Sequence, residues 1–437
     1  MRAKGRQDVD RLPVMFSLAL LALANLKLCQ ADHLHEIKKL YTDHHAEQNV
    51  PCTGDINNVL SNCTCTGTTV DCSYTKDSPF YGNSFLTTIP ILPVNTTQFL
   101  ATGQKISEIQ STSFVNCLDT LSKLDLTGNS LRTIADSNFN GVTNLSNLTL
   151  SNNLISSFNL TSSSDDLTRS VEYLYLNGNH LGGYGNPPLD LSALRNLRQL
   201  YLSGNVLTDV NLPPFLTYLD LSDCEFTAMP ADVSLSMFTL ETLKFNQNRI
   251  TTLDGNVFAN PMSGLNVLYM SECSIKNLNA TFFDSTPVLT DLDLSSNLLN
   301  AEDFQTGTFA SIGNSLQQLD LSYNTIGEFA PALCSDLSSL TRLRYENTAL
   351  GNLGAFNGTC NLGSLSALDL SYNLRLSSID DDSFISQLDG LYELNLSETQ
   401  ISEVACGALR RVKGNLLCFV FSHTNVEMSY IIVYSKN

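Results

Sequence analysis

The sequence predicts a curved solenoid of the α/β repeat class. Each turn is expected to add one short strand to a parallel sheet on the concave face, with loops or short helices on the convex face. Two observations predict this architecture. An eleven-residue pattern returns at nearly constant spacing, and a second apolar column, made of phenylalanine, falls between successive copies.

The pattern is represented by LQQLDLSYNTI, residues 316–326, with leucine at positions 1, 4 and 6, Asn324 at position 9 and Ile326 at position 11. Neither the strict alternation of a half-buried strand nor the three-and-four spacing of an amphipathic helix fits it. Fourteen copies recur at a mean spacing of about 25 residues, within the range of short solenoid repeats. They start at residues 96, 121, 145, 171, 197, 216, 240, 265, 289, 316, 340, 365, 391 and 416, with the first and last degenerate.

Each position has a physical reason. Positions 3 to 7 are expected to form the strand, with positions 4 and 6 pointing inward and bends bringing positions 1 and 11 into the same core. An amide at position 9 can satisfy backbone groups that a buried turn would leave unpaired. The second core column near position 19 or 20 comprises Phe114, Phe139, Phe258, Phe283 and Phe384.

The pattern L-x-x-L-x-L-x-x-N/C-x-L resembles the extracellular leucine-rich repeat proteins of animals, such as Toll-like receptors, Slit-type guidance proteins and small proteoglycans. The resemblance covers about residues 52–426. It implies a horseshoe that recognises ligands through its concave face, acting as a soluble decoy or as a homo- or heterodimer. It does not identify a ligand, because function lies in sites grafted onto a fold.

The N-terminus predicts export. Four basic residues precede the apolar run 12–25, and a small residue, Ala31, follows, as in a secretory signal peptide. A membrane anchor is the alternative, but the run is shorter than a bilayer span requires. The expected organisation is a signal peptide (1–31), a flexible leader (32–51), a cysteine-rich cap (52–95), the repeats (96–429) and an uncapped tail (430–437). The product is expected to be secreted, with no transmembrane segment.

Cysteine usage supports an oxidising compartment. Cys52, Cys63, Cys65 and Cys72 precede the first repeat, where a solenoid needs a cap. The resemblance implies disulfides Cys52–Cys65 and Cys63–Cys72, whereas a zinc site is the rival interpretation.

The other cysteines lie within the repeats. Cys334 and Cys360 occupy similar places in adjacent repeats and could form a bridge. Cys224 and Cys273 both stand at position 9, two repeats apart, which is too far for a disulfide, so they are expected to be buried thiols. Three more cysteines have no obvious partner, namely Cys117, Cys406 and Cys418.

The last repeat is followed only by EMSYIIVYSKN, and the cysteine-bearing closing flank common in relatives is not recognisable. Three explanations stay open. The apolar tail could fold over the final repeat, the chain could be a truncated product of a longer receptor, or a partner could cover the end.

The repeat register identifies the side chains expected on the concave face. The candidate ligand-binding residues are Tyr173, Tyr175, Arg198, Tyr201, Tyr218, Lys244 and Tyr269. Tyrosine is enriched at binding hot spots, but it also suits strands and can stack on neighbours for stability alone. Farther along, an acidic stretch of Asp291, Asp293, Asp320 and Asp369, interrupted by two arginines, is interpreted as a solvated face.

Eight N-x-S/T sequons are candidate glycosylation sites: Asn62, Asn95, Asn144, Asn147, Asn159, Asn279, Asn357 and Asn395. Asn147 and Asn395 fall on concave-face positions. Glycans there would obstruct the two ends of the sheet and leave the tyrosines between them open.

A formal net charge of −19 argues against nucleic acid as a partner. The sequence shows no catalytic motif and no water-excluding pocket, so we expect a non-enzyme without cofactor or metal. Histidines 33, 35, 44 and 45 could bind a metal, but a flexible leader is the simpler interpretation. The expected function is recognition of an extracellular protein or glycan. The alternatives are a matrix or adhesion module, or an inhibitor of a secreted hydrolase.

Overall fold

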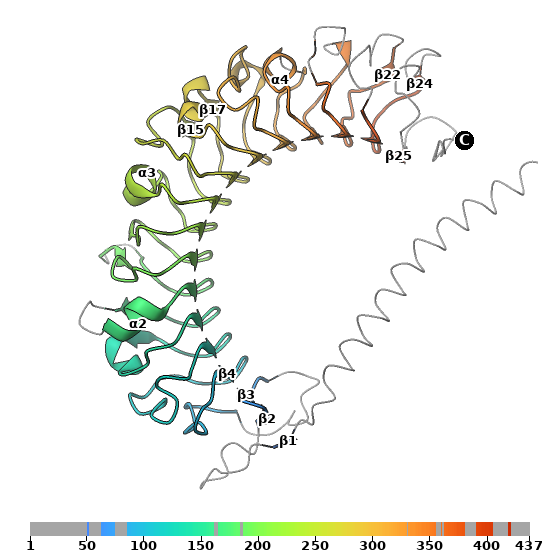
Figure 1. The fold of residues 1–437 in the computed structure, drawn as a ribbon. Coiled ribbons are helices and arrows are strands. Elements are labelled where there is room, and N and C mark those ends of the chain that lie inside the picture. The colour runs from blue at the N-terminus through green and yellow to red at the C-terminus, as the bar shows by residue number, and fades with distance from the viewer. Residues whose placement is uncertain are drawn as a thin grey trace, which may run out of the picture.

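The computed structural model describes residues 50–51, 63–74, 85–160, 165–183, 187–329, 331–354, 360, 362–380, 390–404 and 418–420. Within these ranges the chain coils into a horseshoe whose inner side carries one strand per repeat (Figure 1). The signal peptide predicted for residues 1–31, nearly all of the leader and the tail at 430–437 lie outside the described residues.

The concave sheet is built from strands of only three residues. In the repeats these strands are β4 (Gln98–Leu100), β5 (Lys123–Asp125), β7 (Asn147–Thr149), β9 (Tyr173–Tyr175), β11 (Gln199–Tyr201), β13 (Tyr218–Asp220), β14 (Thr242–Lys244), β16 (Val267–Tyr269), β18 (Asp291–Asp293), β19 (Gln318–Asp320), β20 (Arg342–Arg344), β21 (Ala367–Asp369), β23 (Glu393–Asn395) and β25 (Cys418–Val420). Neighbours pair in parallel with the same repeat positions opposed, so that Leu200 lies between Leu174 and Leu219. This register places equivalent positions of all repeats side by side on one face.

The strands span positions 3 to 5, which is shorter than the expected positions 3 to 7, because the chain turns sharply afterwards. Position 8 has a positive φ in successive repeats, for example 66° at Gly178 and 55° at Asn152. Glycine suits this conformation, and a Cβ on Gly178 would also lie 2.3 Å from Asn152 Oδ1. The turn directs the next side chain, at position 9, into the core.

The position-9 amides link successive turns, as the sequence predicted. Asn153 is 4% exposed, and its Nδ2 donates to the carbonyl of Leu126 in the preceding repeat at 2.9 Å and to that of Leu150 at 3.0 Å. Its Oδ1 accepts from the backbone amide of Leu131 at 3.0 Å. The same arrangement recurs at Asn129, Asn179, Asn205, Asn248, Asn297, Asn324 and Asn373. Backbone groups inside the turns are thereby paired.

Two apolar columns fill the solenoid. Leucines at positions 1, 4, 6 and 11 are almost fully buried behind the sheet. The phenylalanine column predicted nearer the convex side is confirmed where it is described, since Phe114, Phe139, Phe258 and Phe283 are each at most 2% exposed. Phe283 packs on Phe309 of the next repeat with ring centroids 5.3 Å apart. Phe384 lies outside the described residues.

The convex side consists of loops, two-stranded ribbons and short helices (Figure 1). The ribbons pair β6 (Thr133–Ala135) with β8 (Ser157–Asn159), β10 (Leu189–Asp190) with β12 (Val210–Asn211), β15 (Thr252–Leu253) with β17 (Asn277–Leu278), and β22 (Ser378–Ile379) with β24 (Glu403–Val404). The helices are η2 (Asp136–Phe139), α2 (Asp165–Ser170), α3 (Ala231–Ser236), η3 (Ala280–Ser285), η4 (Ala301–Asp303) and α4 (Pro331–Ser335). These outer segments take up more space along the solenoid axis than the strands do. The coil therefore curves so that the sheet lies on its inner side.

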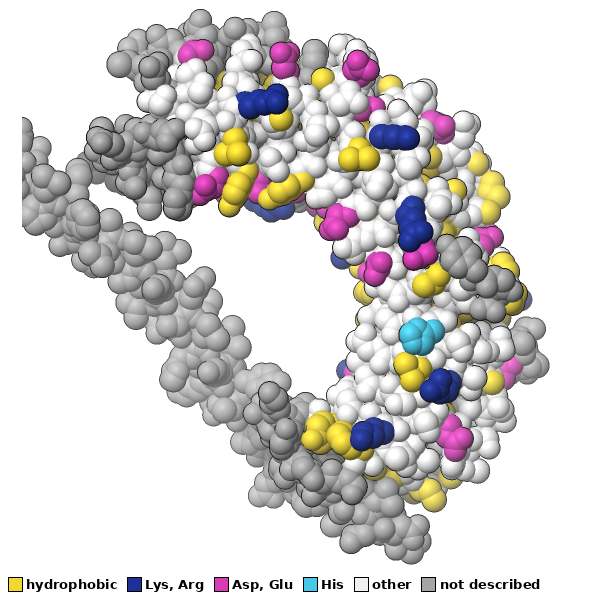
Figure 2. Space-filling model, turned by 180° about the vertical axis from the view of Figure 1, so that it is seen from behind, with side chains coloured by type: hydrophobic (Ala, Val, Ile, Leu, Met, Phe, Trp, Pro, Cys, Tyr) yellow, Lys and Arg dark blue, Asp and Glu magenta, His cyan; other side chains and the backbone are white. Residues whose placement is uncertain are grey.

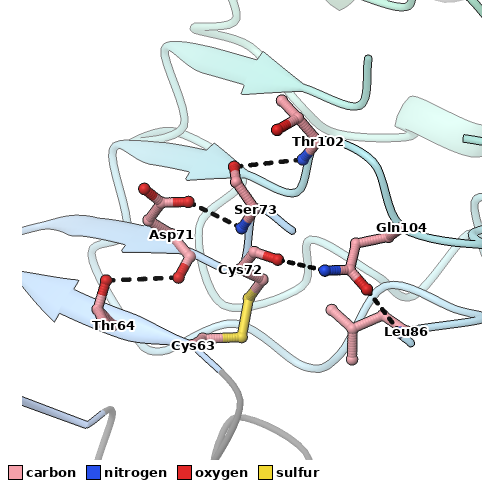
Figure 3. Close-up of a disulfide and its surroundings, with 8 residues drawn as sticks. All are labelled: Cys63, Thr64, Asp71, Cys72, Ser73, Leu86, Thr102 and Gln104. Carbon is pink, nitrogen blue, oxygen red and sulfur yellow. Dashed lines mark hydrogen bonds between the residues drawn. A yellow bond between two sulfur atoms is a disulfide. The ribbon is translucent and has the colours of Figure 1, made fainter. Parts of the chain in front are cut away.

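The N-terminal edge of the sheet is closed by β1 (Val50–Pro51), β2 (Thr64–Thr66) and β3 (Thr69–Asp71). β1 and β2 pair in antiparallel fashion, as do β2 and β3, and β3 then pairs in parallel with β4. The predicted Cys63–Cys72 disulfide is present (Figure 3). Gln104, at position 9 of the first repeat, donates to the Cys72 carbonyl at 2.6 Å and accepts from the Leu86 amide at 2.8 Å (Figure 3). A glutamine side chain, one methylene longer than the asparagine used in other repeats, thus joins the cap to the first repeat.

The remaining described cysteines also agree with the sequence. Cys65 is disulfide-bonded, and its expected partner Cys52 lies outside the described residues. The Cys334–Cys360 bridge is present. Cys224 and Cys273 are buried thiols at position 9, and the Cys224 Sγ donates to the Leu202 carbonyl at 3.3 Å, in place of an amide. Cys117 is a third buried thiol, whereas Cys406 is not described.

Candidate ligand-binding face

Aromatic side chains form a continuous row on the concave sheet. The ring of Tyr175 on β9 stacks on that of Tyr201 on β11, with centroids 4.3 Å apart and planes 11° from parallel. Tyr201 in turn contacts Tyr218 on β13 at 4.7 Å with a 33° tilt. The parallel register places Tyr175 and Tyr201 opposite each other, because strands about 4.8 Å apart hold neighbouring rings at stacking distance. Tyr218 is opposite Gln199 and contacts Tyr201 diagonally.

Lys244 on β14 continues the row. Its Nζ lies 5.7 Å from the ring centroid of Tyr218 and 5.7 Å from that of Tyr269 on β16. Both distances are within the range of a cation–π interaction. Tyr175, Tyr201, Tyr218, Lys244 and Tyr269 therefore make one half-buried strip, called here the tyrosine strip.

Three hydroxyls of the strip, those of Tyr201, Tyr218 and Tyr269, have pKa values raised above the ordinary tyrosine value, so they are protonated at neutral pH. Burial is the largest cause that raises the pKa of Tyr201, and it raises the pKa of Tyr218 to about 12. Burial also raises the pKa of Tyr269, with nearby Asp291 adding to the effect. Tyr201 Oη donates to Gln199 Oε1 at 3.1 Å, and Tyr269 Oη donates to Asp291 Oδ2 at 3.4 Å.

Two predicted site residues lie beside the strip. Tyr173 is on β9 at position 3, between Asn147 and Gln199 in register. Arg198 precedes β11 and is exposed, and its Nη1 donates to the Phe215 carbonyl at 3.3 Å. It therefore borders the sheet where the strands begin, and its guanidinium is turned toward the following repeat. Arg198 lies at this border because it occupies position 2 of its repeat, one residue before the strand.

The acidic stretch has a structural role that the sequence interpretation missed. Position-5 carboxylates accept hydrogen bonds from the backbone amide two residues on, as Asp293 Oδ1 does from Ser295 at 2.9 Å. Such Asx turns fix the start of the loop after each strand. The same bond recurs at Asp125, Asp220, Asp320, Asp369 and, with an amide oxygen, Asn395. The recurring Asp-x-Ser/Thr spacing was the available signal. Burial raises the pKa values of Asp291 and Asp293.

A shallow hollow of about 310 Å³ adjoins the strip. It is lined by Tyr269, Asp291, Asp293, Gln318, Leu319, Asp320, Arg342 and Arg344. Arg344 Nη1 lies 3.5 Å from Asp320 Oδ2 and is about half exposed, so the pair contributes little stability. The concave face thus changes along the arc from aromatic to mixed charge.

Potential glycan acceptors lie at both ends of this face. Asn147 neighbours Tyr173 in register, and Asn395 Nδ2 donates to Asp369 Oδ2 at 3.0 Å. Away from this face, Asn95, Asn144, Asn159 and Asn279 are exposed. Asn62 and Asn357 lie outside the described residues.

Charged groups are dispersed over the lateral surface. In Figure 2, lysine and arginine side chains stand singly along the coil and form no basic patch on that face. In the described ranges no three His, Cys, Asp or Glu side chains are arranged to hold a metal ion. No helix there is both long and apolar enough to cross a membrane. The four leader histidines are not described.

Fold and sequence together define the class: the chain is a leucine-rich repeat protein with a disulfide-bonded N-terminal cap. Residues 119–181 match the family model described as leucine rich repeat, and residues 213–228 match a second leucine rich repeat model. Residues 231–338 match a BspA type leucine rich repeat region.

The relatives are likewise repeat proteins. The chain is 27% identical to the transforming growth factor beta activator LRRC33 of Danio rerio over 283 residues. The aligned region covers 62% of this chain and 37% of the relative. It is 26% identical to the CD180 antigen of Mus musculus over 59% of this chain and 39% of the relative. Osteomodulin of Mus musculus is 29% identical over 30% of each chain. The matches span about a third of these relatives' length.

Solved structures share the fold. An internalin of Listeria monocytogenes superposes with a TM-score of 0.55 at 20% identity, covering 76% of this chain and 87% of that one. A leucine-rich repeat protein of Leptospira interrogans gives a TM-score of 0.56 at 20% identity, covering 79% and 90%.

Proposed function

We propose that the chain is a secreted or cell-surface recognition protein that binds a protein ligand through the tyrosine strip. The observation that carries this proposal is the row of Tyr175, Tyr201 and Tyr218, stacked at 4.3 and 4.7 Å on the concave face. Stacking holds the rings in place before a ligand arrives, which reduces the entropy lost on binding. Ring edges and hydroxyls, together with Lys244, then form the contact surface.

The residues around the strip favour binding over catalysis. The pKa values of Tyr201, Tyr218 and Tyr269 are raised, so these hydroxyls are protonated at neutral pH. The adjoining hollow of about 310 Å³ is open and shallow, with Asp293 and Asp320 engaged by backbone amides. The zebrafish relative is named a transforming growth factor beta activator, which supports a protein as the class of ligand. The disulfides support an oxidising compartment for this chain.

Comparative capture tests the proposal. The glycosylated chain is used to capture proteins from conditioned medium and matrix extracts, beside the double variant Tyr175→Ala/Tyr201→Ala. The matched control is Tyr323→Ala/Tyr372→Ala, which removes two exposed tyrosines located in turns after strands. Quantitative mass spectrometry should show partners that the strip variant loses and the control retains.

The alternatives predict other results. A partner retained by the strip variant would place recognition elsewhere on the solenoid. Collagen or matrix glycans captured equally by both variants would favour the structural matrix role, and a hydrolase inhibited equally by both would favour the inhibitor role.

A further inference from the structure

Lys244 is a half-buried cation at the centre of the concave face. Its ammonium contacts two aromatic rings, those of Tyr218 and Tyr269. The ion pairs within the described residues join Arg249 to Glu225 and Arg344 to Asp320, so no described carboxylate lies within ion-pair distance of Lys244. A positive charge on a curved surface of an acidic protein is thus left for another group to neutralise.

The carboxylates nearest in register are engaged elsewhere. Asp220, which pairs with Lys244 across β13 and β14, accepts from the Ser222 amide at 3.0 Å. Asp291, on the strand beyond Tyr269, accepts from the Tyr269 hydroxyl at 3.4 Å. Each carboxylate thus has a local hydrogen-bond partner, Asp220 through Oδ1 and Asp291 through Oδ2.

Tyr218, beside Lys244, offers a hydroxyl donor to a ligand, whereas the hydroxyls of Tyr201 and Tyr269 already donate to Gln199 and Asp291. Tyr201 is sandwiched between Tyr175 and Tyr218, so its two ring faces are covered and its edge is what a ligand can contact. Ring edges carry positive partial charge, and phenolic hydroxyls donate hydrogen bonds. A sugar ring cannot lie flat on a covered ring face, whereas an anionic oxygen is attracted to ring edges, the Tyr218 hydroxyl and the ammonium.

We propose that Lys244, held between Tyr218 and Tyr269, anchors one aspartate or glutamate side chain of the protein ligand. This inference rests on the proposed function and specifies the chemistry of the group recognised. A single carboxylate fits better than a sulfated glycan. Asp220 stands opposite Lys244 on β13, Asp291 and Asp293 lie two strands away on β18, and these carboxylates repel further negative charge. A charge-assisted hydrogen bond then fixes the ligand's position along the row of tyrosines.

A random twelve-residue peptide library displayed on phage provides a defined probe. It is selected on the full glycosylated chain, and enriched peptides are synthesised with each acidic residue intact or replaced by its amide. Dissociation constants are measured for the wild type, Lys244→Gln, Lys244→Arg and Tyr201→Ala. Lys276→Gln is the matched control, since Lys276 is exposed outside the concave strands. Circular dichroism verifies that each variant is folded.

The expected result is enrichment of peptides that need one particular Asp or Glu. Their affinity should fall about 10-fold or more in Lys244→Gln, in line with a charged hydrogen bond, should recover in Lys244→Arg and should be unchanged in Lys276→Gln. In Lys244→Gln, replacing the peptide's acid by its amide should cause no further loss, because the two groups act on each other.

Other outcomes would overturn the inference. Peptides that need Tyr201 but bind Lys244→Gln normally would leave the proposed function intact and remove the role of Lys244. Displacement of the peptides by a heparin tetrasaccharide, dependent on Lys244, would indicate a polyanionic glycan instead. Peptides indifferent to both Tyr201 and Lys244, or no enrichment at all, would count against the inference and the proposed function together.

Discussion

The Asp293 carboxylate accepts a hydrogen bond from the Ser295 backbone amide at 2.9 Å and so closes the turn after β18. An amide oxygen does the same at Asn395, which accepts from Ser397 at 3.1 Å. The turn therefore needs an acceptor at position 5 and does not need a negative charge.

Asp293→Asn should stabilise the protein near pH 7. Burial raises the pKa of Asp293, so its ionised form is disfavoured in the folded chain, and the amide keeps the acceptor without the charge. The folded wild type binds its proton more readily than the unfolded chain does, so its stability rises as pH falls through the raised pKa toward the ordinary value of about 4. The advantage of Asp293→Asn should shrink over that range, as measured by thermal unfolding at several pH values.

Asp293→Ala is the matched comparison for this turn. It removes both the charge and the acceptor, so the Ser295 amide loses its partner. We expect it to be less stable than Asp293→Asn by about 0.5–1.5 kcal/mol at every pH, the usual contribution of a hydrogen bond. Equal stability of the two variants would contradict the turn-closing role.

Asn153→Ala should destabilise the solenoid. The substitution leaves the Leu131 amide without its buried acceptor, which costs about 1–3 kcal/mol, and removes one of the two hydrogen bonds to the Leu126 carbonyl, which keeps the one from Asn129. Urea unfolding followed by circular dichroism measures this loss. Asn277→Ala, at an exposed ribbon position, should change stability by less than about 0.5 kcal/mol. A similar effect of both changes would mean that the amide ladder contributes little.

The three buried thiols should resist alkylation in the folded protein. Burial raises the pKa of Cys224 to about 12, and those of Cys117 and Cys273 to about 11, so almost no thiolate is present at about pH 8.5. Iodoacetamide should label them only after unfolding, as read by mass spectrometry. Stability should also fall as pH rises above about 9, because the unfolded thiols ionise first. Rapid labelling of the native chain would refute their burial.

Glycosylation at Asn147 should be compatible with ligand binding. Thr149→Val removes the sequon and keeps a β-branched side chain on β7, and the glycan would lie beside Tyr173 at the end of the tyrosine strip. Intact-mass analysis reports whether the site carries a glycan. Partner affinity should stay the same or rise when it is removed. Weaker binding would instead make the glycan part of the recognition surface.

The repeat register could be predicted from the sequence because every turn must satisfy the same packing conditions. Leucines at positions 1, 4, 6 and 11 and the position-9 amides follow from that register alone. The register also put Cys334 and Cys360 at similar places in adjacent repeats, where the bridge that is present could form. Periodicity also placed Tyr175 and Tyr201 on neighbouring strands.

The details of the candidate site could not be predicted in the same way. The stacking of Tyr201 and the position of Lys244 between two rings depend on rotamers, which a repeating pattern does not specify. The register predicts Arg198 as a neighbour of the tyrosines on the sheet, but it stands at position 2, one residue before β11 begins. The turn-closing role of Asp293 was visible as a repeated spacing and could have been inferred.

The most direct test of the recognition strip is the dissociation constant of a captured protein partner for Tyr201→Ala, measured by titration calorimetry beside Tyr201→Phe and Tyr372→Ala. We expect Tyr201→Ala to weaken binding by about 5-fold to 150-fold, corresponding to about 1–3 kcal/mol for a hot-spot anchor. Tyr201→Phe, which keeps the stacked ring, should lose less, and Tyr372→Ala should match the wild type. Wild-type affinity in a folded Tyr201→Ala variant would contradict the placement of the ligand on this face.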